Sequence, residues 1–518
     1  MKIVTTAQMR ELERRAVAAG VSEDALMEAA GLAVAQRVSR LIDGIRGRRV
    51  VVLVGPGNNG GDGMVAARFL ADWGGLVTLY MTSSRRREDK FEECRALRVR
   101  VVEADEDTEQ WQLSSYVSLA DVVIDAVLGI GNDRPLEGVI HGTLSSVNAL
   151  KQSSPLVHYV AIDVPTGLHA DTGACDDACF QAATTLALGA PKLGLYTFPG
   201  AVQAGDVETL DIGLPDGIDG DLSVELSGPE EVAGLLPERP MNSHKGTFGS
   251  ILVVAGSRRF IGAPVLAAEA AYRSGAGLVT LAAPESAYRL AAPRLLEQVH
   301  LPQPETDDGY LAAGAATAVS EALAASDAAV IGPGLGNVDS VRRFLHALLL
   351  GDSEAGVPMV IDADALNGLA ATYGWWEHLA PGAVLTPHPG EMSRLVDRPV
   401  QEVQEDRIEA AASAAARWGQ VVVLKGAHTI VAAPDGRTTI SPFANPGLAT
   451  AGTGDVLSGI IGGLLGQGLP PYEAATAGVY VHAAAGQRVT DELGASGLLA
   501  SELLPEVPKV MRVLRQLR

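Results

Sequence analysis

The chain has 518 residues, which is too many for one ordinary hydrophobic core, so two large domains are expected. Its formal net charge of −22 argues against a basic surface that would bind nucleic acid or an anionic membrane, although backbone amides can still bind the phosphates of a nucleotide. The N-terminus lacks an apolar signal core, no apolar run is long enough for a convincing membrane span, and the three cysteines form no zinc-ligand set. A cytoplasmic protein is therefore expected.

The first half of the chain alternates helical and strand patterns. Residues 5–42 have the apolar spacing of one or two amphipathic helices, and the β-branched run at 49–55 is typical of a buried parallel strand. A glycine-rich turn at 56–63 follows, then a helical pattern at 64–73 and a second strand at 76–81. Such a βαβ unit places the turn at the carboxyl edge of a sheet, where open α/β sheets bind ligands.

Three residues with side-chain oxygens, Asn59, Asp125 and Thr166, lie where strands of this half end. Their oxygens suit a hard cation. Asp163 is a candidate acid or base, and the loop at 129–135 offers backbone amides and an arginine for a phosphate. The alternative is structural, with Asp125 and Asp163 capping adjacent strands.

The boundary between the two domains is expected in the turn-rich, acidic sequence that follows Gly213. We therefore expect one domain at 1–220, a linker at 221–240 and a second domain at 241–518. The second domain repeats the alternation, with a small-residue helix at 263–274 and strands within 249–256, 278–282, 327–331, 357–361, 383–385 and 420–424. A layered α/β architecture is expected here as well.

The most informative stretch of the second half is Gly452-Thr-Gly-Asp455. The apolar spacing after it predicts a buried helix that begins at Asp455. A glycine-lined turn entering a helix favours a transferring phosphate, because it presents unpaired backbone N–H groups and the positive end of the helix dipole. A carboxylate at this point is well placed to take a proton from a substrate hydroxyl. The alternative is an ordinary N-cap aspartate.

Four other turns of the second half are polar or rich in glycine, and they lie at 331–336, 361–367, 385–392 and 424–429. Each of them alone is adequately explained as a structural turn. Because they follow successive strands upstream of Asp455, together they predict one cleft for nucleotide and substrate.

Residues 240–518 resemble the ribokinase-like superfamily, whose anion-hole signature Gly-x-Gly-Asp is matched by Gly452-Thr-Gly-Asp455. Within that superfamily they are similar to the ADP-dependent NAD(P)H-hydrate dehydratases, through the motifs His244-Lys-Gly246, Gly332-Pro-Gly-Leu-Gly336, Thr386-Pro-His-Pro-Gly-Glu391, Lys425-Gly-Ala-His-Thr429 and Asn445-Pro-Gly447. That family phosphorylates the hydroxyl of hydrated NADH or NADPH and then eliminates phosphate.

This resemblance implies roles for individual residues. Asp455 would be the base, and the three residues before it would stabilise charge on the transferred phosphoryl group. The substrate would be contacted by Ala263, Gly336, His388 and Asp455. The nucleotide, ADP with Mg²⁺, would be held by Lys425, Gly426, Ala427, His428, Thr429, Asn445, Gly452, Thr453 and Gly454.

Residues 1–220 resemble the NAD(P)H-hydrate epimerase domain, through Asn58-Asn-Gly-Gly-Asp-Gly63, the 129–135 loop, Asp163-Val-Pro-Thr-Gly167 and Ala190-Pro-Lys192. The resemblance implies K⁺ held by Asn59, Asp125 and Thr166, with Asp163 at the reacting nicotinamide ring. Many relatives have Ser where this chain has Thr166, but the hydroxyl is kept. The implied substrate contacts are Asn58, Asn59, Gly60, Gly61, Asp62, Gly129, Ile130, Gly131, Asn132, Asp133, Arg134, Pro135 and Asp163.

Taken together, the two resemblances imply a Rossmann-like three-layer domain followed by a ribokinase-like α/β domain in one bifunctional nicotinamide nucleotide repair enzyme. Its substrates would be the hydrates NADHX and NADPHX together with ADP, and a homo-oligomer is expected. Two alternatives stay open at this point. One is a small-molecule kinase, for example of a vitamin precursor, with a regulatory N-terminal domain, and the other is a non-enzymatic binding role for that domain.

Overall fold

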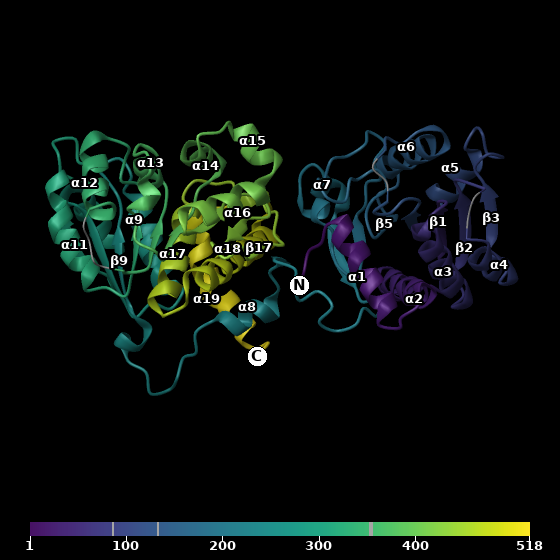
Figure 1. Ribbon diagram of the computed structural model, residues 1–518, viewed down its shortest axis with the longest axis horizontal. Coiled ribbons are helices and arrows are strands. Elements are labelled where there is room, and N and C mark those ends of the chain that lie inside the picture. The colour runs from purple at the N-terminus through teal and green to yellow at the C-terminus, as the bar shows by residue number, and fades with distance from the viewer. Residues whose placement is uncertain (85–86, 132–133, 352–355) are drawn as a thin grey trace. The chain divides into compact units, whose positions relative to one another are not determined.

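The computed structural model describes residues 1–84, 87–131, 134–351 and 356–518. These residues form two compact units, Met1–Leu222 and Ser223–Arg518, and each unit is an α/β layer structure (Figure 1). Within the described ranges we find no helix with the length and apolar character that a membrane span requires.

The first unit is built on a parallel sheet whose strand order is β3-β2-β1-β4-β5-β6-β7. The strands are β1 (Arg49–Val54), β2 (Leu76–Met81), β3 (Arg100–Glu103), β4 (Val122–Ala126), β5 (His158–Ile162), β6 (Thr184–Leu188) and β7 (Asp206–Leu210). The helices are α1 (Thr6–Ala18), α2 (Glu23–Leu41), α3 (Asn58–Asp72), α4 (Glu88–Ala96), α5 (Trp111–Ser118), α6 (Gly138–Ser153) and α7 (Gly200–Ala204).

Alternate residues of β1 feed two separate hydrophobic cores, as the period of two in a strand requires. Val50, Val52 and Val54 pack with helices α1 to α4, whereas Val51 and Leu53 pack with α5 and α6. Figure 1 shows these helices on the two faces of the sheet. The three-layer Rossmann-like architecture expected from the sequence is therefore confirmed.

The strand order of this unit changes direction between β1 and β4, and such a switch point opens a crevice at the carboxyl ends of the strands. The glycine-rich stretch that follows β1 is helical from Asn58 onward, although the sequence predicted a turn up to residue 63. Close packing explains its glycines, because a Cβ on Gly60 would lie 2.1 Å from the carbonyl oxygen of Gly55 and one on Gly63 would lie 2.3 Å from the Cβ of Ala126. The N-terminus of α3 is thereby drawn down to the switch point.

The second unit has a mixed sheet whose order is β11-β10-β9-β12-β13-β14-β15-β16-β17-β8. Its strands are β8 (Val224–Leu226), β9 (Ser250–Val254), β10 (Leu278–Pro284), β11 (Val299–Gln303), β12 (Ala328–Ile331), β13 (Met359–Ile361), β14 (Ala383–Leu385), β15 (Val421–Leu424), β16 (Ile430–Ala432) and β17 (Thr438–Ile440). Pairing is parallel from β11 to β15 and antiparallel from β15 to β17.

The helices of the second unit cover this sheet. They are α8 (Pro229–Leu235), α9 (Gly262–Arg273), α10 (Glu285–Ala291), α11 (Ala316–Ala324), α12 (Asp339–Leu349), α13 (Asp364–Ala370), α14 (Pro389–Val396), α15 (Val400–Glu405), α16 (Arg407–Trp418), α17 (Thr453–Gly466), α18 (Pro471–Leu493) and α19 (Ala500–Arg515). The structure differs from the sequence prediction at 221–240, since the expected linker contains β8 and α8. Strand β8 pairs with β17, and the Ser227 N–H donates to the Ile440 carbonyl at 3.0 Å.

Helix α17 begins at Thr453, two residues earlier than predicted, with Gly452 as its N-cap at φ +93°. Its glycines allow close contact with α9, because a Cβ on Gly459 would lie 2.2 Å from the carbonyl oxygen of Ala267. The apolar side chains of α17 join the central core of the unit. Asp455 thus occupies the first turn of a helix that is fixed by packing.

Candidate functional site

Asp455 lies in a cluster of ionisable side chains at the carboxyl ends of the central strands of the second unit. Its pKa is raised to about 7, by burial first and by the Asp362 carboxylate next, while the Lys425 ammonium group opposes the rise. Because the ordinary pKa of this group is 3.8, Asp455 is poised to exchange a proton near neutral pH. It can therefore serve as a base for a substrate hydroxyl.

Lys425 is the cation of this cluster, and it follows β15. Its Nζ lies 2.7 Å from Asp362 Oδ1 and 3.8 Å from Glu391 Oε2. The Ser458 hydroxyl, one turn into α17, donates to the other oxygen of Asp362 at 2.6 Å. The carboxylates of Asp362, Glu391 and Asp455 therefore face one ammonium group, and this surplus of negative charge fits a Mg²⁺ ion carried by nucleotide phosphates.

The glycine turn before Asp455 lies beside the same ammonium group, since a Cβ on Gly454 would be 3.5 Å from Lys425 Nζ. The N-cap residue Gly452 has no side chain to cap the first turn of α17, so the turn is open to an anion. The Thr453 hydroxyl, in contrast, donates back to the Leu448 and Thr450 carbonyls. An anion at this turn would meet backbone donors and Lys425.

The predicted nucleotide stretch 425–429 is a strained loop with φ +144° at Gly426 and φ +51° at His428. Thr429 closes it, because its hydroxyl donates to the Gly426 carbonyl at 2.7 Å. The His428 ring packs inward and its Nδ1 lies 3.1 Å from the Ser441 carbonyl oxygen. Asn445 is also engaged within the protein, accepting from the Gly447 N–H and donating to the Thr490 hydroxyl. The His428 side chain therefore anchors the loop at 425–429, and the Asn445 side chain anchors the separate turn at 445–447. Lys425 and the backbone of the loop are the parts nearest to the cluster.

The predicted substrate residues lie at neighbouring strand ends. His388 caps α14, with its Nε2 3.4 Å from Glu391 Oε1, and burial is the main cause that lowers its pKa. Gly336 donates its N–H to Asp364 Oδ2 at 2.7 Å, and a Cβ there would lie 2.4 Å from the Tyr310 ring, so only glycine fits. Ala263 lies against the glycine-rich loop at 332–336, because a Cβ added to Gly334 would be 2.9 Å from the Cβ of Ala263.

Four residues at this site were not assigned a role from the sequence. Asp362 and Glu391 stood out only as polar groups at strand ends, and Ser458 was overlooked although it lies three residues after Asp455 on the same helix. His482 of α18 donates its Nε2–H to the Thr453 carbonyl at 2.9 Å, and burial lowers its pKa to about 4. No local sequence pattern marks His482, which reaches the turn from α18, the helix that follows α17 and packs against it.

The switch point of the first unit holds a second group of polar residues. Asp125 is fully buried at the end of β4, and burial raises its pKa to about 6. Its carboxylate accepts from the Thr166 N–H and from the Thr166 hydroxyl, both at 2.7 Å. Both amide atoms of the buried Asn59 lack a hydrogen-bond partner among the described residues. An oxygen set with one unsatisfied amide fits the hard cation expected from the sequence.

Asp163 lies after β5 in the left-handed conformation, at φ +68°. Its carboxylate pairs with the Lys192 ammonium group, which is only 1% exposed, and accepts from the Leu188 N–H at 3.1 Å. Both residues line a cavity of about 670 Å³, together with the predicted Asn58, Asn59, Asp62, Gly129, Ile130 and Gly131. The structure therefore brings the predicted acid or base and the predicted substrate loops to one cavity.

Two of the other carboxyls that line the same cavity have raised pKa values. The pKa of Asp62 is raised well above its ordinary value, and that of Glu13 is raised, in both cases by burial first and by the Asp163 carboxylate next. Sequence analysis missed Glu13, because an acid in an amphipathic helix such as α1 resembles an ordinary solvent-facing residue. Of the remaining predictions, Gly60 and Gly61 are buried in α3, Arg134 and Pro135 are exposed, and Asn132 and Asp133 lie outside the described residues.

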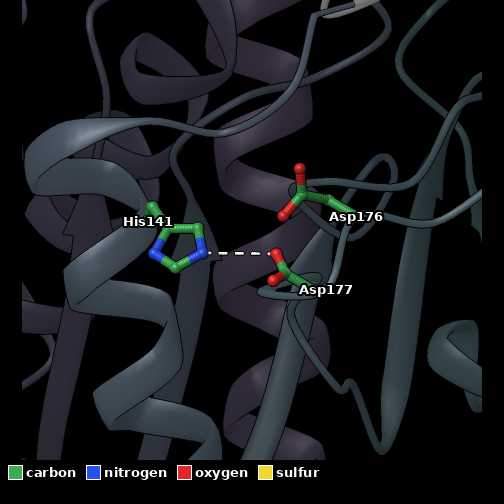
Figure 2. Close-up of side chains that lie close together, drawn as sticks. All are labelled: His141, Asp176 and Asp177. Carbon is green, nitrogen blue, oxygen red and sulfur yellow. Dashed lines mark hydrogen bonds and ion pairs between the residues drawn. The ribbon is translucent and has the colours of Figure 1, made fainter.

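His141, Asp176 and Asp177 form a separate cluster in the first unit, with ligand-type atoms within 4.8 Å of one another (Figure 2). The dashed line in Figure 2 joins His141 Nε2 to Asp177 Oδ1 at 3.2 Å. Asp176 is used by the backbone, because its two oxygens accept from the Leu136 and Ala178 N–H groups. Since the Asp177 side chain is 86% exposed, the arrangement is explained as a surface ion pair beside a structural turn.

Comparisons with known proteins match both units. A family described as NAD(P)H-hydrate dehydratase matches residues 251–509, and one described as YjeF-related protein N-terminus matches residues 23–194. The chain is 38% identical to the bifunctional NAD(P)H-hydrate repair enzyme Nnr of Moorella thermoacetica, over 100% of this chain and 98% of that protein. It is 35% identical to the protein of the same name in Escherichia coli K12, over 90% of this chain and 85% of that protein.

One solved structure bears on the fold of the second unit. It is a ribokinase-like superfamily protein from Enterococcus faecalis V583, which is 26% identical to this chain with a TM-score of 0.50. The match covers 57% of this chain and 97% of that protein. The expected ribokinase-like class of the second unit is therefore confirmed.

Proposed function

Because the chain belongs to the family of bifunctional NAD(P)H-hydrate repair enzymes, we propose that each of its two units carries one of the two activities. The unit Met1–Leu222 exchanges the R and S epimers of NADHX and NADPHX. The unit Ser223–Arg518 dehydrates the S epimer with ADP, giving NADH or NADPH, AMP and phosphate. An epimerase on the same chain lets the whole damaged pool reach a dehydratase that accepts one epimer. If the second unit were instead a vitamin-precursor kinase, its reaction would not require epimer exchange by the first unit.

The observation that carries the dehydratase assignment is Asp455, a half-buried carboxyl with a pKa near 7 in the first turn of α17, after a glycine that cannot cap this turn. In its ionised form it removes the proton from the C6 hydroxyl of the substrate as that oxygen attacks the terminal phosphorus of ADP, and AMP leaves. The open turn before Asp455 and the Lys425 ammonium group stabilise the charge on the transferred phosphoryl group. Phosphate then leaves C6, a proton leaves C5, and the reduced nicotinamide ring is restored.

The epimerase assignment rests on the cavity that Asp163 shares with the α3 N-terminus. Epimer exchange at C6 needs the hydroxyl to leave from one face of the ring and water to add to the other, so protons must be given and taken beside the ring. Asp163 is placed for this work, and Lys192 holds its carboxylate in position. Asn59, Asp125 and Thr166 would hold K⁺, which supplies a fixed positive charge near the substrate. Cytoplasmic location and self-association stay predictions.

We expect Thr166→Val to weaken both the local fold and the response to K⁺. Valine has the shape of threonine but leaves the Leu128 N–H, now 2.9 Å from the Thr166 hydroxyl, without its acceptor, and removes a donor to Asp125. The cost is about 1–3 kcal/mol in the free energy of unfolding. The K⁺ concentration for half-maximal epimer exchange should rise, whereas Thr166→Ser keeps the hydroxyl and should stay close to the parent. Equal K⁺ responses in all three proteins would refute the ion site.

The proposed function is tested by the recovery of reduced-nicotinamide absorbance from a mixture of R and S NADHX, with K⁺, Mg²⁺ and either ADP or ATP. Complete recovery with ADP is the expected result and supports both activities and the donor. If recovery stops at the fraction of the mixture that is one epimer, the proposed dehydratase activity is supported and the proposed epimerase activity is refuted. No recovery with either nucleotide would reject the dehydratase.

A further inference from the structure

Arg407, the first residue of α16, lies beneath the loop that follows β15. Its Nη1 donates to the Ala427 carbonyl at 2.6 Å, and its Nη2 donates to the Leu424 and Lys425 carbonyls, both at 3.2 Å. One guanidinium group therefore holds three of the four carbonyls from Leu424 to Ala427. Planar, fixed donors of this kind are a property of arginine that lysine does not share.

The approach of Arg407 depends on the glycine in the middle of this loop. A Cβ on Gly426 would lie 2.8 Å from Arg407 Nη2 and 3.2 Å from its Cζ, so a side chain there would displace the guanidinium group. Gly426 also has φ +144°, a conformation that L-residues rarely adopt. The glycine and the arginine thus depend on each other, although they are 19 positions apart in the chain.

The charge of Arg407 has no partner of opposite sign in the part of the chain that the structure describes. No carboxylate of residues 1–84, 87–131, 134–351 and 356–518 forms an ion pair with it, and its buried Nε has no hydrogen-bond partner there. Burial lowers its pKa to about 10, and no acid acts against that effect. A cation that is partly removed from water without a carboxylate partner carries a desolvation cost. An anion bound on the other side of the loop would offset part of that cost.

We propose that Arg407 is a positioning residue for the nucleotide of the dehydratase reaction. It acts through the backbone of Leu424 to Ala427, which it holds in the shape that receives an anionic nucleoside diphosphate, and its uncompensated charge favours that ligand. The inference rests on the proposed function, because the loop at 425–429 is the proposed nucleotide site. It assigns no contact between Arg407 and the reacting atoms.

The test measures kcat, the KM for ADP and the KM for S-NADHX in Arg407→Gln and Arg407→Lys, with ADP binding measured separately by calorimetry. Loss of charge-assisted hydrogen bonds should raise the KM and Kd for ADP about tenfold or more in Arg407→Gln, and less in Arg407→Lys. The KM for S-NADHX and kcat should change less than about threefold. Arg417→Gln is the matched control. Arg417 lies near the opposite end of the same helix, where its guanidinium group stacks on the Trp376 ring instead of contacting the loop.

A merely structural role gives a different result. Partial misfolding of the second unit would lower kcat while leaving the KM for ADP unchanged, and the epimerase activity of the same chain provides the reference for enzyme concentration. Either that pattern or an unchanged Kd for ADP in both variants would overturn the proposal. If Arg407→Gln does not fold, the Kd for ADP of Arg407→Lys decides alone. Failure of the proposed function is distinguishable, because the parent protein would then show no recovery with ADP.

Discussion

Asp455→Asn should lower the dehydratase rate at least about a hundredfold, and epimer exchange by the same protein should be unchanged. General-base catalysis contributes roughly 10²–10⁴ in rate, and asparagine cannot accept the proton of the substrate hydroxyl. The substitution should not disrupt the cluster, because Lys425 keeps its ion pairs with Asp362 and Glu391. The measurement is the absorbance of NADH formed from S-NADHX and ADP. A variant that retains more than a tenth of the parent rate would refute Asp455 as the base.

The raised pKa of Asp455 predicts the pH dependence of this reaction. Only the carboxylate can act as the base, so kcat/KM for the dehydratase should fall about tenfold per pH unit below the folded-state value of about 7. The pH profile of epimer exchange should not show this fall in kcat/KM below pH 7, so epimer exchange serves as the control reaction. Ser458→Ala should leave the limb in place, because Ser458 donates to Asp362 and not to Asp455. A kcat/KM that stays flat down to pH 5 would contradict the assignment.

Stability should respond to pH in the opposite sense. Folding raises the pKa of Asp455 above its ordinary 3.8, so the folded chain binds this proton more tightly than the unfolded chain. The resulting stabilisation of the folded state is complete below pH 3.8, the ordinary pKa of the group, and it is lost as the pH rises through about 7. At pH 8 Asp455→Asn should therefore be more stable than the parent, on the order of 1–3 kcal/mol. A half-buried carboxyl that acts as a base would thus reduce the stability of the folded chain at the pH where it is ionised.

The sequence predicted most of the architecture because the relevant signals are local. The β-branched run of β1 and the glycines around Gly60 lie next to one another in the chain, and so do Gly452 and Asp455. Their order along the chain is enough to place a strand, a close helix and a helix-terminal carboxylate. The short strand β8 was taken for a linker because its pairing partner, β17, lies more than 200 residues later.

The missed site residues have the same explanation. Ser458 meets Asp362 across 96 positions, and Arg407 reaches the loop at 424–427 from a helix whose other residues are ordinary. Glu13 faces a cavity that α1 lines together with the first turns of α3 and with Asp163, residues that only folding brings together. Periodicity assigns such residues to the polar face of a helix, and only the tertiary fold shows that this face lines a site.

Asp163→Asn should slow epimer exchange at least about a hundredfold, while dehydration of S-NADHX continues at the parent rate. Asparagine suits the position better than alanine, because Asp163 has φ +68°, a conformation that Asn tolerates well. Its side-chain oxygen can still accept from the Leu188 N–H and the Lys192 ammonium group. What is lost is the ability to take and give a proton. With a mixed-epimer substrate, recovery of NADH should stop at the share of the S form.

The buried Lys192 makes this experiment sharper. In Asp163→Asn its ammonium group, 1% exposed, loses its only carboxylate partner among the described residues, so the variant should be less stable than the parent. Adding Lys192→Met removes the unpaired charge and should restore stability without restoring epimer exchange. If the double variant recovers exchange as well as stability, Asp163 acts only by neutralising Lys192, and the proton-transfer role falls. If stability alone returns, the carboxylate itself is needed at the ring.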